Sequence, residues 1–179
     1  MDGRINEARH GNRDALGSLV REHYSRVYRF CARRIGDDLA QDAAQETFVT
    51  MQRSLKRYEE RSSFETWLLG IAHNHCRNLA RKRRLDPVSL DAWVECGRNE
   101  QPTIFDKEAL RNALSKLTEE HREVVRLHEI EGLRYAEIAE ILGVPEGTVK
   151  SRLHHAFINL RRLLCDKDVV GRPSVEEKT

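Results

Sequence analysis

The 179-residue sequence has little of what strands and disulfide-bonded domains require. Aromatic residues make up 6% of the chain, and Pro and Cys occur only 4 times each. The cysteines are far apart and form no CxxC pair, so their spacing does not indicate a disulfide framework. Because strands are enriched in β-branched and aromatic side chains, we expect neither an all-β fold nor a small secreted scaffold.

Long hydrophobic runs are absent as well. The longest apolar stretch, 67–72, is far shorter than the roughly 20 residues that cross a bilayer. The N-terminal residues are charged and lack the apolar core of a secretory signal. We therefore expect a cytoplasmic protein without membrane insertion.

Helix-forming and charged residues are plentiful. Leu, Ala, Glu and Arg are abundant and 34% of residues are charged, a composition that favours helices. Residues 1–84 carry 17 basic and 11 acidic side chains, whereas 85–106 carry 1 basic and 5 acidic ones. The acidic segment also contains Pro and Gly and has no helical periodicity, which indicates a linker. We predict an all-α protein in which a flexible acidic linker joins two small helical domains.

The predicted N-terminal domain, 13–84, contains three segments in which apolar side chains recur every three or four residues, the pattern of amphipathic helices. Gly36 is suited to end the first helix. The second helix opens near Asp37, and Ser63 is the predicted N-cap of the third. The apolar stripe of this third helix includes Trp67, Ile71 and His75.

Two of these helices have informative polar faces. Opposite its apolar stripe, the second helix carries a polar triplet, Asp42, Gln45 and Glu46. The third helix carries a basic stripe with interspersed Asn, made of Asn74, Arg77, Asn78 and Arg81. A basic stripe on an exposed helix face is typical of nucleic-acid binding. A solvated basic face without a ligand is the alternative interpretation.

The predicted C-terminal domain, 107–165, contains a helix-turn-helix. One helix ends at Gly143, Pro145 prevents its continuation, and a second helix starts directly afterwards. Two short helices joined by a Gly-containing three-residue turn form this motif. Polar and basic side chains gather just after the turn, where a recognition helix contacts DNA: Lys150, Ser151, Arg152, His154 and His155.

Four motifs in this order resemble extracytoplasmic-function (ECF, group IV) RNA polymerase sigma factors. They are YRFCARRIGD, QDAAQETFV, RSSFETWLLGIAHN and YAEIAEILGVPEGTVKSRL, and the resemblance extends over about 13–165. It implies a sigma region 2-like domain at 13–84, the linker at 85–106, a region 4-like domain at 107–165 and a polar tail at 166–179. It implies no catalytic residues, cofactor or metal, because polymerisation belongs to the core enzyme.

The resemblance also implies roles for the residues named above. Asp42, Gln45 and Glu46 match the segment that docks on the polymerase β′ clamp, and the β subunit is a further expected partner. The loop 58–63 matches the region that opens the −10 element and holds a flipped base. The residues that match the family's −10 contacts are Phe64, Trp67, Asn74, Arg77, Asn78 and Arg81. Those that match its −35 contacts are Lys150, Ser151, Arg152, His154 and His155. Promoter DNA and an anti-sigma factor are therefore expected partners.

The sequence departs from the family pattern at two places. Family members commonly continue the recognition helix with basic residues, whereas this chain has His155, Phe157 and Ile158. Ala44 stands where Leu is frequent. The sequence leaves open whether His155, Phe157 and Ile158 contact DNA, polymerase or a partner.

The sequence has two alternative functional interpretations. A metal site on His73, His75 and Cys76 is disfavoured because positions i and i+2 point to different helix faces. A stand-alone helix-turn-helix regulator would bind duplex DNA without polymerase. It would have no use for the QDAAQETFV and RSSFETWL motifs.

Overall fold

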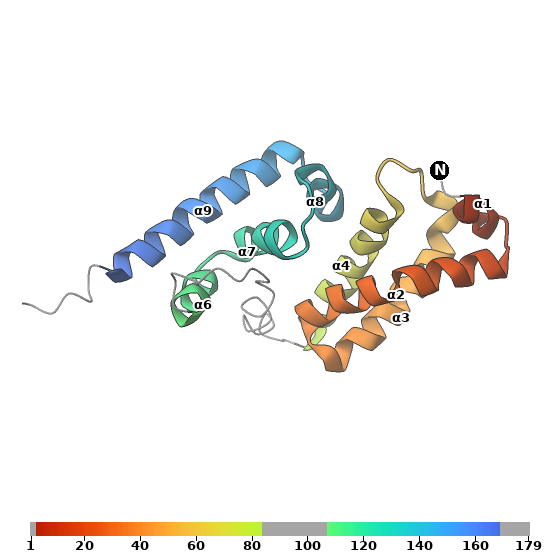
Figure 1. Cartoon of the computed structure of the whole chain (residues 1–179), viewed down its shortest axis with the longest axis horizontal. Helices are drawn as coiled ribbons and strands as arrows, with labels where there is room; N and C mark the ends of the chain where they lie inside the picture. The colour runs from red at the N-terminus through yellow and green to blue at the C-terminus, as the bar shows by residue number, and fades with distance from the viewer. Residues whose placement is uncertain (1–2, 84–106, 169–179) are drawn as a thin grey trace, which may run out of the picture. The chain divides into compact units, whose positions relative to one another are not determined.

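The computed structural model describes residues 3–83 and 107–168, and every regular element in these ranges is a helix (Figure 1). This confirms the all-α prediction. The predicted linker 85–106 and residues 169–179 of the predicted tail lie outside the described residues. In the part of the chain that is described, no helix is long and apolar enough to cross a bilayer.

The described residues form two compact units. The first comprises 3–83 together with Ala136–Val144, and the second comprises the remaining described residues. Predicted helix boundaries within 13–83 agree well with the structure. Helix α8 (Tyr135–Leu142), except Tyr135, is grouped with the first unit rather than with the helices that flank it in the sequence.

The first unit is built on three long helices and two short ones that the sequence did not predict. They are α1 (Gly3–Arg9), α2 (Arg13–Ile35), α3 (Asp37–Ser54), the short η1 (Leu55–Arg57) and α4 (Phe64–Arg83). Helices α2, α3 and α4 all pack against one another, and α1 packs against α2. Fully buried Leu19, Phe30, Met51, Leu68 and Leu69 form the core between them.

Local signals explain where these helices begin and end. The Asn12 side chain accepts hydrogen bonds from the Asp14 and Ala15 amides at the start of α2. Gly36 has a φ of +80°, a conformation that glycine adopts without strain, and it separates α2 from α3. The Thr66 amide donates to Ser63 Oγ at 3.0 Å, which confirms the predicted N-cap of α4.

The second unit contains α6 (Lys107–Ser115), α7 (Glu119–Val125), the π-helical turn η2 (Arg126–Ile130) and α9 (Glu146–Asp168). Helix α9 packs against α6 and α7. The sequence predicted one continuous helix up to Gly132, but the hydrogen bonding changes at Arg126, where η2 begins. The predicted helix from Glu146 also continues three residues beyond 165.

The predicted helix-turn-helix consists of α8 (Tyr135–Leu142), the turn 143–145 and α9. Gly143 has a φ of +66°, and the Val144 amide donates to Ala139 O at 3.1 Å, which closes the end of α8. The Thr148 amide donates to Pro145 O at 2.9 Å and starts α9. The left-handed Gly143 predicted from the sequence is thereby confirmed.

Candidate polymerase and nucleic-acid interfaces

The polar face of α3 is exposed as expected. Asp42, Gln45 and Glu46 are all exposed, whereas Ala43 and Ala44 between them are fully buried. The spacing i, i+3, i+4 places the three polar side chains on one helix face. Since they have no role in the core, this face is available for a polar partner.

The basic stripe of α4 is exposed too. Asn74, Arg77, Asn78 and Arg81 are exposed, and their i, i+3, i+4, i+7 spacing keeps them on one side of the helix. The same helix buries Leu68, Leu69 and Cys76 on its other side. A rigid, well-packed helix therefore presents two cations and two amides to solvent together.

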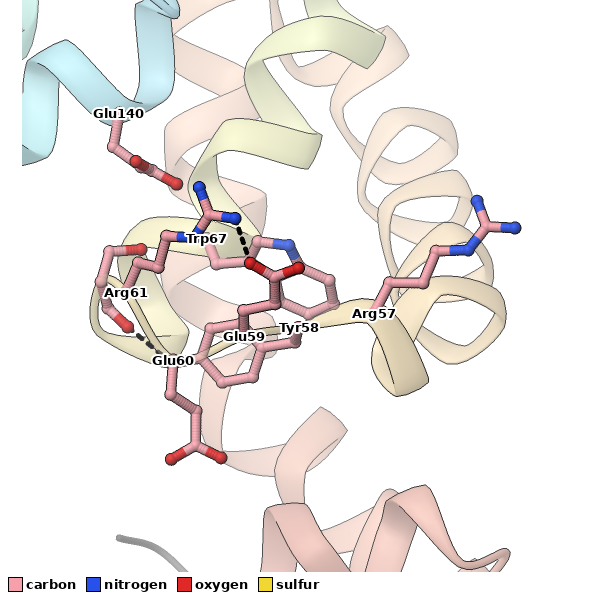
Figure 2. A pocket seen from close by; sticks show the side chains of 8 residues that line it. Arg57, Tyr58, Glu59, Glu60, Arg61, Trp67 and Glu140 are labelled. Carbon is pink, nitrogen blue, oxygen red and sulfur yellow. Dashed lines mark hydrogen bonds and ion pairs between the residues drawn. The ribbon is translucent and has the colours of Figure 1, made fainter.

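An aromatic cluster lies where the 58–63 loop enters α4. The Tyr58 ring lies 4.9 Å from the Trp67 ring and 5.7 Å from the Phe64 ring, measured between centroids. Figure 2 shows Tyr58 and Trp67 side by side beneath the loop. Tyr58 and Phe64 are only 7% and 8% exposed, whereas Trp67 is half-buried. Phe64 therefore supports the cluster from within, and Trp67 provides the accessible aromatic surface.

Hydrogen bonds and charge fix this loop. The Tyr58 hydroxyl donates to Ser62 O at 2.7 Å, and burial raises the pKa of that phenol, an effect to which Glu60 adds and which Arg9 opposes. Glu60 has a φ of +58°, which is uncommon for a residue with a side chain. The loop thus has a defined but strained shape.

A hollow opens at this loop (Figure 2). It is lined by 57–62 and Trp67, with Glu140 from the α8 segment of the same unit. Arg61 forms an ion pair with Glu59 on its rim. The hollow combines an aromatic wall with polar groups, the surroundings that an unstacked base requires.

The exposed face of α9 carries the predicted recognition residues. Lys150, Ser151, His154 and His155 are exposed, and Leu153 between them is buried. The imidazole rings of His154 and His155 lie 5.6 Å apart, and His121 of α7 lies 6.5 Å from His155. Three imidazoles therefore gather on the same side of the second unit.

The two predicted cations of this face are already engaged in ion pairs. Lys150 Nζ lies 2.9 Å from Glu146 Oε1, and Arg152 Nη2 lies 2.9 Å from Glu120 Oε2 of α7. The Arg152 side chain is 23% exposed, so it lies at the edge of the face rather than on it. A DNA phosphate would therefore compete with a carboxylate at each of these cations.

The family comparisons match both units. The model described as Sigma-70 region 2 matches residues 19–85, and the model described as Sigma-70, region 4 matches residues 107–160. The chain is 34% identical over 166 residues to RNA polymerase sigma factor CarQ of Myxococcus xanthus, covering 90% of this chain and 95% of CarQ. It is 30% identical to ECF RNA polymerase sigma factor SigW of Bacillus subtilis, covering 91% and 96% of the two chains.

The chain belongs to the ECF RNA polymerase sigma factors. It is therefore a transcription initiation factor, a non-enzymatic class of protein. The solved structure of CnrH in complex with the cytosolic domain of CnrY is similar to it, with a TM-score of 0.63, 28% identity, and coverage of 91% of this chain and 96% of CnrH.

The structure of the sigma factor adds residues that the sequence analysis missed. Arg9 of α1 contacts the 58–63 loop through its guanidinium, and Glu120 and Glu146 hold the cations of α9. Asn12, two residues before an acidic side chain, was an available capping signal for α2. Nothing in the sequence indicated the partners of Arg9 or Arg152, because both contacts join distant parts of the chain.

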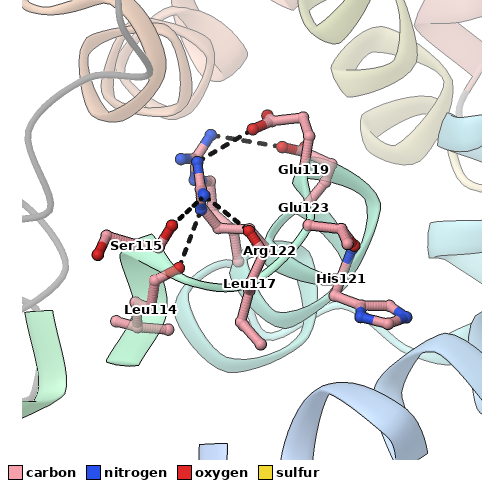
Figure 3. A network of polar contacts seen from close by, with 9 residues as sticks. Leu114, Ser115, Leu117, Glu119, His121, Arg122 and Glu123 are labelled. Carbon is pink, nitrogen blue, oxygen red and sulfur yellow. Dashed lines mark hydrogen bonds and ion pairs between the residues drawn. The ribbon is translucent and has the colours of Figure 1, made fainter. Parts of the chain in front are cut away.

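Arg122 organises the junction of α6 and α7 in the sigma factor, and it too was missed. Its guanidinium donates to Leu114 O at 3.1 Å, Ser115 O at 3.0 Å and Leu117 O at 2.8 Å. Figure 3 shows Arg122 at the centre of these carbonyls, with Glu119 beside it. One side chain thereby donates to two carbonyls in the last turn of α6 and to one in the segment that follows.

The three residues of the alternative metal site do not form a metal-binding cluster in the structure of the sigma factor. His73 and Cys76 are 7% and 2% exposed, and His75 Nε2 lies within hydrogen-bond distance of Thr50 Oγ1, at 2.9 Å. His73, rather than the predicted His75, is the more deeply buried histidine. In residues 3–83 and 107–168, no group of three or more potential ligands is placed to hold a metal ion.

Proposed function

We propose that this sigma factor binds bacterial core RNA polymerase, recognises the −10 and −35 promoter elements, and helps to melt the promoter. In this proposal 13–84 is the domain for polymerase binding and −10 melting, and 107–165 is the domain for −35 recognition. The linker 85–106 passes through the polymerase, and 166–179 is a polar tail.

The observation that carries the proposal is the arrangement of α4 and the loop before it. One helix presents the exposed Asn74, Arg77, Asn78 and Arg81 and begins beside an aromatic-walled hollow. Cations neutralise phosphates, amides bind base edges, and aromatic rings stack on unpaired bases. A single-stranded −10 segment could use all three kinds of contact along one element, with Trp67 as the stacking surface and Phe64 beneath it.

The exposed α3 face supports the assignment of polymerase binding. Asp42, Gln45 and Glu46 offer two carboxylates and an amide on a helix whose other side is fully buried. Such a face can exchange polar contacts with the β′ clamp without any rearrangement of the core.

Recognition of the −35 element is assigned to α9. Its exposed Lys150, Ser151, His154 and His155 can reach base edges and phosphates from one helix face. Arg152 joins them once Glu120 is released.

A protein inhibitor is part of the proposal as well. CnrH was solved in complex with the cytosolic domain of CnrY, and the family resemblance implies an anti-sigma factor. We therefore expect a proteinaceous partner that competes with core polymerase for this sigma factor.

The test separates melting from −35 recognition. With core polymerase and a promoter selected from a library, permanganate footprinting measures opening on duplex and on pre-melted bubble templates. Asn74→Ala should slow promoter opening on the duplex template. Its activity should recover on the bubble template, because the bubble already supplies the unstacked bases. Arg152→Ala should lose initial binding on both templates.

A matched control is Asn112→Ala, which removes an exposed amide from α6 and should behave as the unmodified chain on both templates. Equal recovery of the Asn74 and Arg152 variants on the bubble would contradict the division of roles between the two domains.

A further inference from the structure

We propose that Arg9, the last residue of α1, is a positioning residue that holds the 58–63 loop in the shape that accepts an unstacked base. The inference deepens the proposed function and rests on it. Helix α1 precedes the residues 19–85 that match Sigma-70 region 2, so the family match assigns no role to it.

Four contacts connect Arg9 to the loop and to the helix end before it. Its Nε donates to Leu55 O at 3.3 Å, and its Nη2 donates to Tyr58 O. Its Nη1 lies 3.0 Å from Glu60 Oε1, and its guanidinium carbon lies 5.5 Å from the centre of the Tyr58 ring. The planar guanidinium, with donors in a fixed fork, can make these contacts simultaneously.

The loop needs such a restraint because of Glu60. Its φ of +58° is a left-handed conformation that persists in a residue with a side chain only where the surroundings enforce it. The ion pair to Arg9 engages the Glu60 side chain, and the hydrogen bond to Tyr58 O fixes the backbone two residues earlier. Arg9 thus acts on the loop at its strained position.

The same contact sets the charge around the hollow. The loop carries two adjacent carboxylates, Glu59 and Glu60, at a place where nucleic acid is expected. Arg61 pairs with Glu59 and Arg9 pairs with Glu60, and Figure 2 shows the Glu60 carboxylate pointing away from Arg61 and Trp67. Without Arg9, an unpaired carboxylate would remain beside the hollow.

Tyr58 transmits the restraint to the aromatic wall. Its carbonyl is held by Arg9, while its buried ring contacts Trp67 at 4.9 Å and Phe64 at 5.7 Å. A shift of the Tyr58 backbone would therefore displace the ring against which Trp67 packs. Arg9 itself does not need to contact DNA.

Helix α1 provides a fixed base for Arg9. Ile5 is buried, and Arg4 pairs with Glu22 of α2 at 2.6 Å and lies 3.4 Å from Ser18 Oγ. Arg4 thus anchors α1 on α2. Asn6→Ala, which removes an exposed side chain from the same helix, is the control for Arg9→Ala.

The first measurement is hydrogen exchange of the complete chain without polymerase. Arg9→Ala should speed exchange of the amides in 58–63 by about tenfold, the change that ~1.4 kcal/mol of lost restraint produces. Asn6→Ala should leave exchange in this loop unchanged. Equal exchange in the Arg9 variant and the unmodified chain would overturn the inference, whatever the outcome for transcription.

The second measurement is promoter opening with core polymerase. Arg9→Ala should open duplex promoter about tenfold more slowly, recover on a pre-melted bubble, and bind core polymerase as tightly as the unmodified chain. Opening at the unmodified rate, or equal slowing by Asn6→Ala, would contradict a positioning role for Arg9. Failure of the unmodified chain to open any promoter would instead overturn the proposed function.

A double-mutant cycle tests whether Glu60 is the loop residue through which Arg9 acts. Arg9→Ala and Glu60→Gln should be non-additive in opening rate, because each removes the same ion pair. The control cycle combines Arg9→Ala with Glu59→Gln, whose carboxylate pairs with Arg61, and should be additive. Additivity in both cycles would contradict the assigned contact.

Discussion

The two charged residues of α9 that are proposed to bind DNA are held by carboxylates in the free sigma factor. Glu146 holds Lys150 and Glu120 holds Arg152, each at 2.9 Å. Exposed pairs of this kind contribute ~0.2–1 kcal/mol, so a phosphate can displace the carboxylate at small cost. The pairs reduce the charge that α9 offers to non-specific DNA.

Release of Arg152 should therefore strengthen −35 binding. We expect Glu120→Gln to tighten binding of the holoenzyme to a −35 duplex by up to about fivefold, the range set by ~1 kcal/mol for an exposed pair. Binding is measured by fluorescence anisotropy at several salt concentrations. Glu119→Gln makes the same change of charge at the neighbouring position, which pairs with Arg122 instead. Equal effects of the two variants would contradict a specific role for the Arg152 pair.

Tyr58 should make folding sensitive to alkaline pH. Burial raises the pKa of this phenol above its usual value of 10.0, so the folded state retains a proton that the unfolded state releases. This stabilisation is complete below the unfolded pKa and is lost as the pH rises through the folded pKa. Urea unfolding between pH 9 and 12 (a range of about 3 units around the usual phenol pKa) should show the free energy of unfolding falling, and less so in Tyr58→Phe. An identical fall in Tyr58→Phe would assign the effect to other groups.

At the scale of elements, the second unit depends on one buried junction. Arg122, whose side chain is 11% exposed, closes the end of α6 through three carbonyls and begins the packing of α7 against α9. Thr118 caps α7 by accepting from the His121 amide at 3.3 Å. The short helices of this unit are therefore held by side-chain-to-backbone hydrogen bonds as well as by apolar packing.

Removal of Arg122 should destabilise this unit. Arg122→Ala removes the side-chain donor from three carbonyls, of which Leu114 O keeps the bond from the Leu117 amide, and each lost charged hydrogen bond costs about 1–3 kcal/mol. Arg161→Ala, which removes an exposed arginine from α9, should stay within about 0.5 kcal/mol of the unmodified chain. Urea unfolding followed by circular dichroism compares the two. Equal stability of both variants would show that water replaces Arg122 without cost.

The α3 face should bind polymerase without contributing to folding. Asp42→Arg and Glu46→Arg should weaken binding to core polymerase in a pull-down, while stability changes by about 0.5 kcal/mol or less. Asn112→Arg at an exposed position of α6 serves as the control for added positive charge. Undiminished binding of the Asp42 and Glu46 variants, with unchanged helicity, would refute the assignment of this face.

Element types and caps could be predicted from the sequence because they depend on local patterns. The helix periodicity, Gly36, Ser63 and Gly143 all have local signatures, and the structure confirms each of them. The exposed positions on α3, α4 and α9 followed from the same periodicity.

Contacts between distant residues could not be predicted. Helix α1 has seven residues, too few for a periodic pattern, and Arg9 reaches residues 46 to 51 positions away. Burial of His73 instead of His75 depends on how α4 is rotated against its neighbours, which single-helix periodicity defines only within about one residue. The π-helical turn η2 likewise lacks a sequence signature.

At the scale of the whole molecule, the net charge of +2 is small for a DNA-binding protein. Few phosphates can be neutralised, and the two best-placed cations of α9 already have carboxylate partners. Sequence-independent affinity for duplex DNA grows with the number of neutralised phosphates. The isolated sigma factor should therefore bind promoter DNA weakly and gain specificity only with core polymerase.

The most direct test compares promoter binding and opening by the complete chain with and without bacterial core polymerase, on matched promoter and scrambled duplexes. We expect no sequence preference for the chain alone. With core polymerase, we expect specific binding to the promoter followed by permanganate reactivity at the −10 element. Tight, sequence-specific binding by the isolated chain, or specific binding with core polymerase but no opened −10 bases, would contradict the proposed function.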